Sequence, residues 1–167
     1  MIKRVIFASL FMVLAALLQS TVLSRLRLYA LPDLALCILI FTAYVNGSMT
    51  GQLNGFISGF FIDFISAAPL GLNAFIRTLV GALSGLLKGT FFLDPFFLPM
   101  ILCALATILK ALLYFLLNIV LGDTVPSYSL FEGKFWMELG LNTILAPFLF
   151  GLLKLASSLL VGEGDKT

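Results

Sequence analysis

Apolar residues run through this chain with so few interruptions that a water-soluble fold has no room for them. Of its 167 residues, 61% are hydrophobic and only 11% are charged, whereas soluble domains are about 45–50% apolar and about 25% charged. A water-soluble structure of this composition would expose large apolar patches and aggregate. Because a lipid bilayer solvates such surfaces, the sequence predicts an integral membrane protein surrounded mainly by the bilayer.

Six apolar segments can be separated at polar or glycine-rich turns. They cover approximately residues 5–23, 34–45, 51–68, 72–87, 96–121 and 135–161. Backbone groups in hydrocarbon must pair within their own segment, and these segments lack the polar–apolar alternation of barrel strands, so each is expected to be a helix. The sequence therefore predicts a single all-α domain, residues 1–167, built as a bundle of six transmembrane helices.

The division between the second and third segments depends on the polar stretch 46–51. Residues 34–68 are too many for one membrane helix and slightly few for two. Asparagine, glycine, serine and threonine together favour a turn, so two short helices are predicted here. An arrangement with five spans is the alternative that the sequence leaves open.

Basic residues outside the segments orient the bundle. With the N-terminus inside, five lysines and arginines lie on the inner side and three on the outer side. This bias predicts that both termini are cytoplasmic. Lys3 and Arg4 precede the first apolar segment, and no small-residue cleavage site follows it, which favours a retained signal anchor over a cleaved signal peptide.

Small residues recur every four positions on both sides of a turn at residues 69–71. The series before the turn is Gly51, Gly55, Gly59 and Asp63, and the series after it is Arg77, Gly81, Gly85 and Gly89. In an antiparallel hairpin centred on Leu70, Gly51 would face Gly89, and the other glycines would pair in the same symmetrical way. Lipid supplies no hydrophobic force between helices, and small residues let helices approach closely. The glycines are therefore predicted to form a helix-packing seam and a partner interface.

The same symmetry predicts an intramembrane ion pair between Asp63 and Arg77. Both residues lie seven positions from Leu70. An arginine near the middle of a membrane helix costs about 2.5–3.5 kcal/mol, and an acid at equal depth would lower that cost. The pair is interpreted as a structural contact that holds the hairpin in register, with a site for a partner or ligand as the alternative.

The last two segments carry a second set of polar residues, predicted to form a polar seam. Its members are Lys110, Tyr114, Asn118, Glu138 and Asn142. Polar residues within spans usually face the bundle or a cavity, and a hairpin would bring Asn118 near Glu138. Lys110 has no partner in this scheme, so it is expected to reach Asp63 or to extend its ammonium group toward the membrane surface. The seam is interpreted as interhelical contact, with the wall of an outward-facing pocket as the alternative.

Residues that common enzyme sites need are missing from the sequence. There is no histidine, which excludes a Ser-His-Asp triad and histidine-based zinc or haem sites. Cys37 and Cys103 both lie inside apolar segments and are too few for a cysteine metal site. The net charge of +2 gives no reason to expect a nucleic-acid partner. No catalytic residue, metal or cofactor is predicted, and the protein is not expected to be an enzyme.

Three short motifs occur in order between Leu31 and Asn73. They are Leu31-Pro32-Asp33-Leu34, then Gly55-Phe56-Ile57-Ser58-Gly59-Phe60-Phe61-Ile62-Asp63, then Leu70-Gly71-Leu72-Asn73. With the length and short loops of the chain, they resemble the bacterial rod shape-determining protein family MreD. The residues that fall in the characteristic segment of the family are Pro32, Asp33, Gly55, Gly59, Asp63 and Gly71.

The resemblance implies a fold, a location and partners. The fold is expected to be similar to the substrate-binding subunits of energy-coupling-factor vitamin transporters. Family members sit in the bacterial inner membrane and bind MreC. They belong to the elongation complex with the actin-like MreB, the glycosyltransferase RodA and a class B penicillin-binding protein. The implied function is a non-catalytic membrane scaffold that supports peptidoglycan synthesis and rod shape.

The alternative function is a substrate-binding membrane subunit of a vitamin-type transporter. In that case the polar seam and the outer loop would form the ligand pocket. Such a subunit also needs a face of small residues for its coupling partner, and Ala16 and Ser20 offer only a weak version of one. The sequence leaves open whether the protein forms homo-oligomers and in what ratio it binds MreC.

Overall fold

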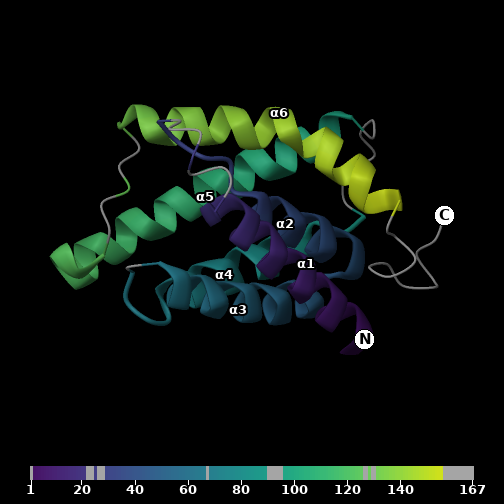
Figure 1. Ribbon diagram of the computed structural model, residues 1–167, viewed down its shortest axis with the longest axis horizontal. Helices are drawn as coiled ribbons and strands as arrows, with labels where there is room; N and C mark the ends of the chain where they lie inside the picture. Colours follow the sequence, from purple (N-terminus) through teal and green to yellow (C-terminus); the bar gives the residue numbers. More distant parts are fainter. Residues whose placement is uncertain are drawn as a thin grey trace.

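The computed structural model describes residues 2–21, 25, 29–66, 68–89, 96–125, 128 and 131–155. These residues form six α-helices and no strand, so the prediction of an all-helical chain with six helices is confirmed (Figure 1). The helices are α1 (Ile2–Thr21), α2 (Leu34–Asn46), α3 (Ser48–Ile65), α4 (Leu72–Leu86), α5 (Phe97–Leu121) and α6 (Gly133–Leu155), with a short 3-10 helix, η2 (Gly122–Thr124), after α5. The predicted end of the last segment, residues 156–161, lies outside the described residues.

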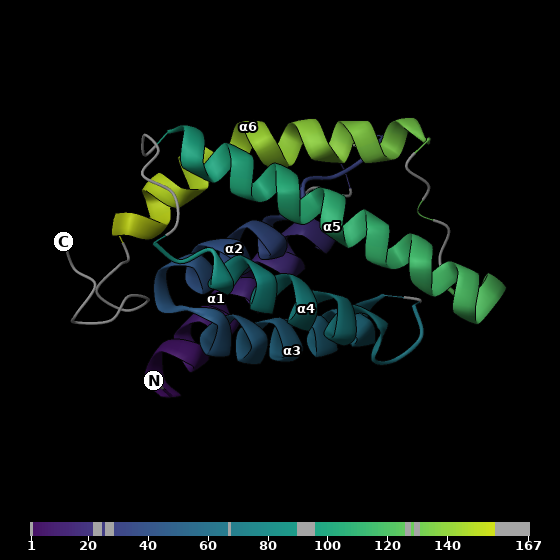
Figure 2. The same ribbon diagram turned by 180° about the vertical axis from the view of Figure 1, so that it is seen from behind.

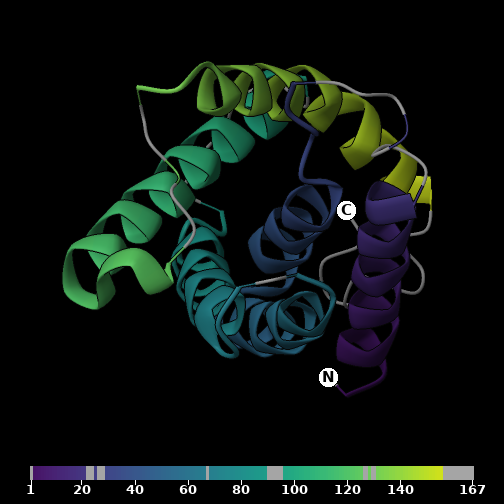
Figure 3. The ribbon, with the colours of Figure 1, turned by 60° about the vertical axis from the view of Figure 1, so that its left-hand side comes forward.

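Helix α2 is the centre of the molecule and contacts each of the other five helices. It is apolar on all sides, which is the pattern of a helix enclosed by others, and its residues from Ala35 to Ala43 are buried. Figure 3 shows the other helices arranged around it. The ring of Phe41 on α2 meets Phe150 on α6 edge-on, with 5.1 Å between the ring centres.

Helices α2 and α4 are shorter than a bilayer is thick. Their 13 and 15 residues extend about 20 and 23 Å at about 1.5 Å per residue, against a hydrocarbon core of about 30 Å. By contrast, α5 and α6 are long and apolar enough to cross a membrane. The residue that caps α2, Asp33, and the first residue of α4, Leu72, are both buried, so the first N–H groups of these helices need acceptors inside the protein.

Helices α3 and α4 lie side by side and form the most extensive helix pair of the described structure (Figure 2). Gly51 lies against the backbone of Gly81, and Gly55 lies against the backbone of Arg77. A Cβ atom at either position would overlap main-chain atoms of the other helix. The same holds for Gly59, Gly81 and Gly85. We refer to these five glycines as the glycine seam, and their lack of side chains lets the two backbones touch.

The register of this pair differs from the symmetrical one predicted around Leu70. Gly51 faces Gly81, eight residues before its predicted partner Gly89, and this moves the contact about 12 Å along α4. Gly89 lies in the turn after α4, and among the described residues no heavy atom comes within 4 Å of its Cβ position, so its assignment to the seam was wrong. The register shifts because α4 begins beside the last turns of α3, where its first residues lie against Gly59.

The substitution Gly55→Ala tests the glycine seam. Its methyl group overlaps the Arg77 carbonyl, and overpacking of this kind costs about 1–3 kcal/mol, so the melting temperature of the purified protein in detergent should fall. Gly140→Ala in α6 is the matched control, because a Cβ at Gly140 meets no atom of the described residues within 4 Å. It should keep or raise the melting temperature, since alanine favours helix over glycine by about 1 kcal/mol. Equal melting temperatures for both variants would contradict the seam.

Candidate functional site: a buried charge network

Asp33 lies at the start of α2 and is only 4% exposed. Its Oδ1 accepts a hydrogen bond from the backbone N–H of Leu36 at 3.0 Å. Its own backbone N–H donates to Oδ1 of Asn142 on α6 at 2.7 Å. Both contacts satisfy polar groups that would be costly to bury unpaired, so Asp33 is the N-terminal cap of the central helix.

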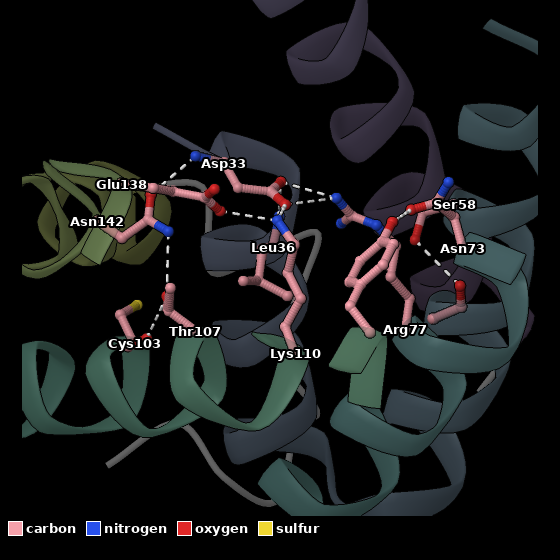
Figure 4. A network of polar contacts seen from close by, with 12 residues as sticks. Asp33, Leu36, Ser58, Asn73, Arg77, Cys103, Thr107, Lys110, Glu138 and Asn142 are labelled. Atoms are coloured by element: carbon pink, nitrogen blue, oxygen red, sulfur yellow. Dashed lines mark hydrogen bonds and ion pairs between the residues drawn. The ribbon is translucent and has the colours of Figure 1, made fainter. Parts of the chain in front are cut away.

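Two cations converge on the Asp33 carboxylate (Figure 4). Nη2 of Arg77 on α4 lies 2.7 Å from both carboxylate oxygens. Nζ of Lys110 on α5 lies 2.8 Å from Oδ2 and also 2.7 Å from Oε1 of Glu138 on α6. We call Asp33, Arg77, Lys110, Glu138 and Asn142 the Asp33 network. It joins α2, α4, α5 and α6 at one place, where ion pairs are strong because water is largely excluded.

Neutral side chains extend the Asp33 network at its α6 side. Asn142 donates from Nδ2 to Oγ1 of Thr107 on α5 at 3.0 Å. The phenol of Tyr128, in the loop before α6, donates to Oε2 of Glu138 at 2.7 Å. Burial raises the pKa of Tyr128, Lys110 opposes this shift, and the Glu138 carboxylate adds to it. The phenol is protonated at neutral pH, as it already is at its ordinary pKa of about 10, so it can donate to Glu138.

Asp63, near the end of α3, caps α4 much as Asp33 caps α2. Its carboxylate accepts the backbone N–H groups of Gly71, Asn73 and Ala74 at 2.9–3.1 Å. It also accepts Nδ2 of Asn73 at 3.0 Å. Asp63 is 2% exposed, and these four donors, together with the positive end of α4, stabilise its negative charge.

The predicted ion pair between Asp63 and Arg77 is wrong. Arg77 pairs with Asp33 at 2.7 Å, and Asp63 binds the first amides of α4 instead. Arg77 faces Gly55 on α3, which is eight residues, or about 12 Å, from Asp63 along that helix. The expectation that Lys110 reaches Asp63 is also wrong, because its ammonium group binds Asp33 and Glu138.

The structure divides the predicted polar seam. Three of its members belong to the Asp33 network: Lys110, Glu138 and Asn142. Tyr114 donates to Oδ1 of Asn73 at 2.7 Å and thereby joins α5 to the Asp63 cap. Asn118 donates to two backbone carbonyls just after α5, at 3.3 Å, so it closes the end of that helix and the predicted contact with Glu138 is wrong.

Sequence reasoning missed the central place of Asp33 and grouped it only with the motif residues. A usable signal was present, because an aspartate just before an apolar helix is a typical N-terminal cap. The neighbouring motif residues also have structural roles. Pro32 is buried beside Asp33. Gly71 has a φ of 94°, a conformation that favours glycine, and gives its N–H to Asp63.

The family model described as rod shape-determining protein MreD matches residues 1–156 of this chain. The chain belongs to the MreD family. No curated protein and no solved structure matches the chain. The matched range contains the Asp33 network, the Asp63 cap and the glycine seam. Family membership implies a role in rod-shape determination, and with the apolar helices it makes this a bacterial membrane protein.

The polar groups of this MreD protein hold helices together. Within the described residues, each of the three buried carboxylates accepts hydrogen bonds from donors on other helices or at helix starts. No group of three or more histidine, cysteine, aspartate or glutamate side chains able to hold a metal occurs in the described part of the chain. Cys37 and Cys103 are buried free thiols. The arrangement therefore fixes the relative positions of four helices.

A double-mutant cycle between Asp33→Asn and Arg77→Gln measures the central ion pair of this MreD protein. Each single change leaves a buried group without its charged partner, which costs about 3–5 kcal/mol. The two changes together should cost less than their sum, with a coupling of up to about 3 kcal/mol in the free energy of unfolding in mixed micelles.

The control is the cycle between Asp63→Asn and Arg77→Gln, which tests the pair predicted from sequence. Its coupling should lie within about 0.5 kcal/mol of zero. A larger coupling in the Asp63 cycle than in the Asp33 cycle would contradict the structure.

Proposed function

We propose that this MreD protein is a non-catalytic membrane scaffold of the cell-elongation complex and binds MreC directly. The observation that carries the proposal is the match to the rod-shape family over residues 1–156. The structure supports it because Asp33, Arg77 and Lys110 fasten helices to one another. A bundle held in this way presents outer helix faces of fixed shape, on which membrane partners can pack.

The partner surface lies away from the glycine seam in this proposal. The seam glycines were predicted to serve both internal packing and a partner. In the structure, Gly51 and Gly55 lie directly against the backbone of α4, so a partner helix has no access to them. A membrane partner must therefore use side chains on the outer faces of the helices.

An aromatic stripe on the outer face of α3 is the surface that we assign to MreC. Phe56, Phe60 and Phe64 are 55%, 42% and 63% exposed. Their rings pack in sequence, with centres 6.1 and 4.8 Å apart. Helix association in lipid depends on van der Waals packing, and clustered aromatic side chains often carry most of the binding energy. This phenylalanine stripe would receive the single membrane helix of MreC.

The proposed scaffold lies in the inner membrane as a bundle of six spans, with both termini in the cytoplasm. Its fold would be similar to that of the substrate-binding subunits of energy-coupling-factor transporters. In the complex with MreB, RodA and a class B penicillin-binding protein, it would hold MreC so that wall synthesis outside the membrane is coupled to filaments inside. The scaffold thereby supports peptidoglycan synthesis through position and contact.

Co-purification of MreC from membranes tests the phenylalanine stripe. The triple substitution Phe56→Ala, Phe60→Ala and Phe64→Ala removes three exposed rings and should lower the recovery of MreC about tenfold or more, since hot-spot truncations cost about 2 kcal/mol or more. Phe148→Ala on α6 is the control, because Phe148 is more exposed than any of the three, at 68%, and lies on another helix. It should leave the recovery unchanged.

Two results would count against the proposed interface. The first is full recovery of MreC with the triple variant. The second is an equal loss with Phe148→Ala, which would show that any apolar change at the protein surface disturbs the complex. The melting temperature of each variant must match that of the unchanged protein, so that a loss of MreC reports on contact and not on unfolding.

A further inference from the structure

A cavity of about 430 Å³ opens between α1, α3, α4 and α5, next to the start of α2. Part of its lining is polar and is formed by Asp33, Asn73, Arg77, Lys110 and Tyr114. Another part is apolar and includes Ile62 and Ile65 of α3. A volume of about 300–1,000 Å³ with apolar walls and a few converging polar groups is typical of small-molecule sites.

The lining also contains an amide that is not used inside the protein. Gln19 lies two residues before the end of α1 and lines the cavity. Its side chain is only partly buried, and within the described part of the chain its amide takes part in no hydrogen bond. Gln52 on α3, by contrast, donates to Oγ of Ser48. Because Gln19 lines the cavity and keeps accessible surface, a molecule in the cavity can reach its amide.

The cavity opens where two helices end. Ser20 and Ile65 are exposed members of its lining, and they lie at the ends of α1 and α3. In the proposed bundle of six spans, helix ends lie near the boundary between membrane and water. A water-soluble molecule can therefore enter without crossing the hydrocarbon core.

The charges of the lining indicate that the ligand is uncharged. Arg77 pairs with Asp33, and Lys110 pairs with both Asp33 and Glu138, so two cations face two acids in the Asp33 network. The carboxylate of Asp63 is stabilised by the first N–H groups of α4. A charged ligand would add an unpaired charge beside a largely buried and balanced cluster, and such a charge is strongly penalised.

We propose that this cavity binds a small uncharged amide from the aqueous phase, whose N–H and C=O groups pair with the amide of Gln19 and whose apolar part lies against Ile62 and Ile65. A glutamine side chain offers both a donor and an acceptor, and a ligand amide offers the complementary pair. A ligand with only an acceptor would leave Oε1 of Gln19 without a donor. The site is separate from the phenylalanine stripe on α3, and its test requires no MreC.

The test compares four probes of nearly equal shape. Benzamide carries the amide on an apolar ring, acetophenone keeps the carbonyl but has no N–H donor, benzoate is an anion and benzamidine is a cation. Titrations followed by saturation-transfer-difference NMR, with the protein in lipid nanodiscs, measure the affinity of each probe. Benzamide should bind about fivefold to tenfold more tightly than acetophenone, which is the contribution of a neutral hydrogen bond. The two ions should bind more weakly than benzamide.

Three variants connect this preference to the cavity. Gln19→Leu keeps the approximate size of the side chain and removes the amide, so benzamide and acetophenone should bind equally, with the melting temperature of the protein unchanged. Ile65→Trp places a larger side chain at the opening, where Ile65 is 47% exposed, and should weaken both probes. Gln52→Leu is the matched control, because it removes a glutamine amide outside the cavity lining, and it should keep the preference for benzamide.

Four outcomes would overturn the proposal. Equal binding of benzamide and acetophenone by the unchanged protein, or no binding of either, would mean that the cavity does not select an amide. Tightest binding of benzoate or benzamidine would assign a charged ligand. A preference for benzamide that persists in Gln19→Leu would place the recognition elsewhere. A preference that is lost equally in Gln52→Leu would show that it does not depend on this cavity.

Discussion

The structure depends on how the first backbone N–H groups of two short helices are paired, because these helices begin inside an otherwise apolar protein. Helices α2 and α4 begin at buried positions, and in hydrocarbon surroundings their first N–H groups have no water to bind. Asp33 and Asp63 meet this demand with carboxylates. A buried carboxylate in turn needs hydrogen-bond donors or cations that stabilise its negative charge. Asp63 is stabilised by the backbone amides at the start of α4, and Asp33 is stabilised by Arg77 and Lys110.

The ion pairs that stabilise the Asp33 carboxylate have consequences for the whole bundle. Its two cations come from α4 and α5, and Lys110 continues to Glu138 on α6, so one capping residue fixes the positions of three further helices around α2. Removal of any of its four charged members would leave a buried charge with fewer partners, which makes the arrangement strongly interdependent. A membrane scaffold benefits from this interdependence, because a partner that packs on one helix face then meets a surface held by the rest of the protein.

The sequence predicted the elements better than it predicted their register. Long apolar segments and glycines at intervals of four correctly indicated six helices and the close contact of α3 with α4, because both features depend on local spacing. The symmetrical pairing of Asp63 with Arg77 failed because it assumed that α4 starts beyond the end of α3. Where α4 starts depends on the capture of its first amides by Asp63. The network around Asp33 and the cavity beside Arg77 join residues far apart in the chain, so no local pattern reports them.

The most direct test of this account is an experimental structure of the protein in lipid nanodiscs at a resolution that shows side chains. The quantity to measure is the distance from the Arg77 guanidinium to each buried carboxylate. The account predicts hydrogen-bond contact between Arg77 and Asp33, with Asp63 bound to the backbone N–H groups at the start of α4. Contact between Arg77 and Asp63, with those N–H groups directed elsewhere, would contradict it.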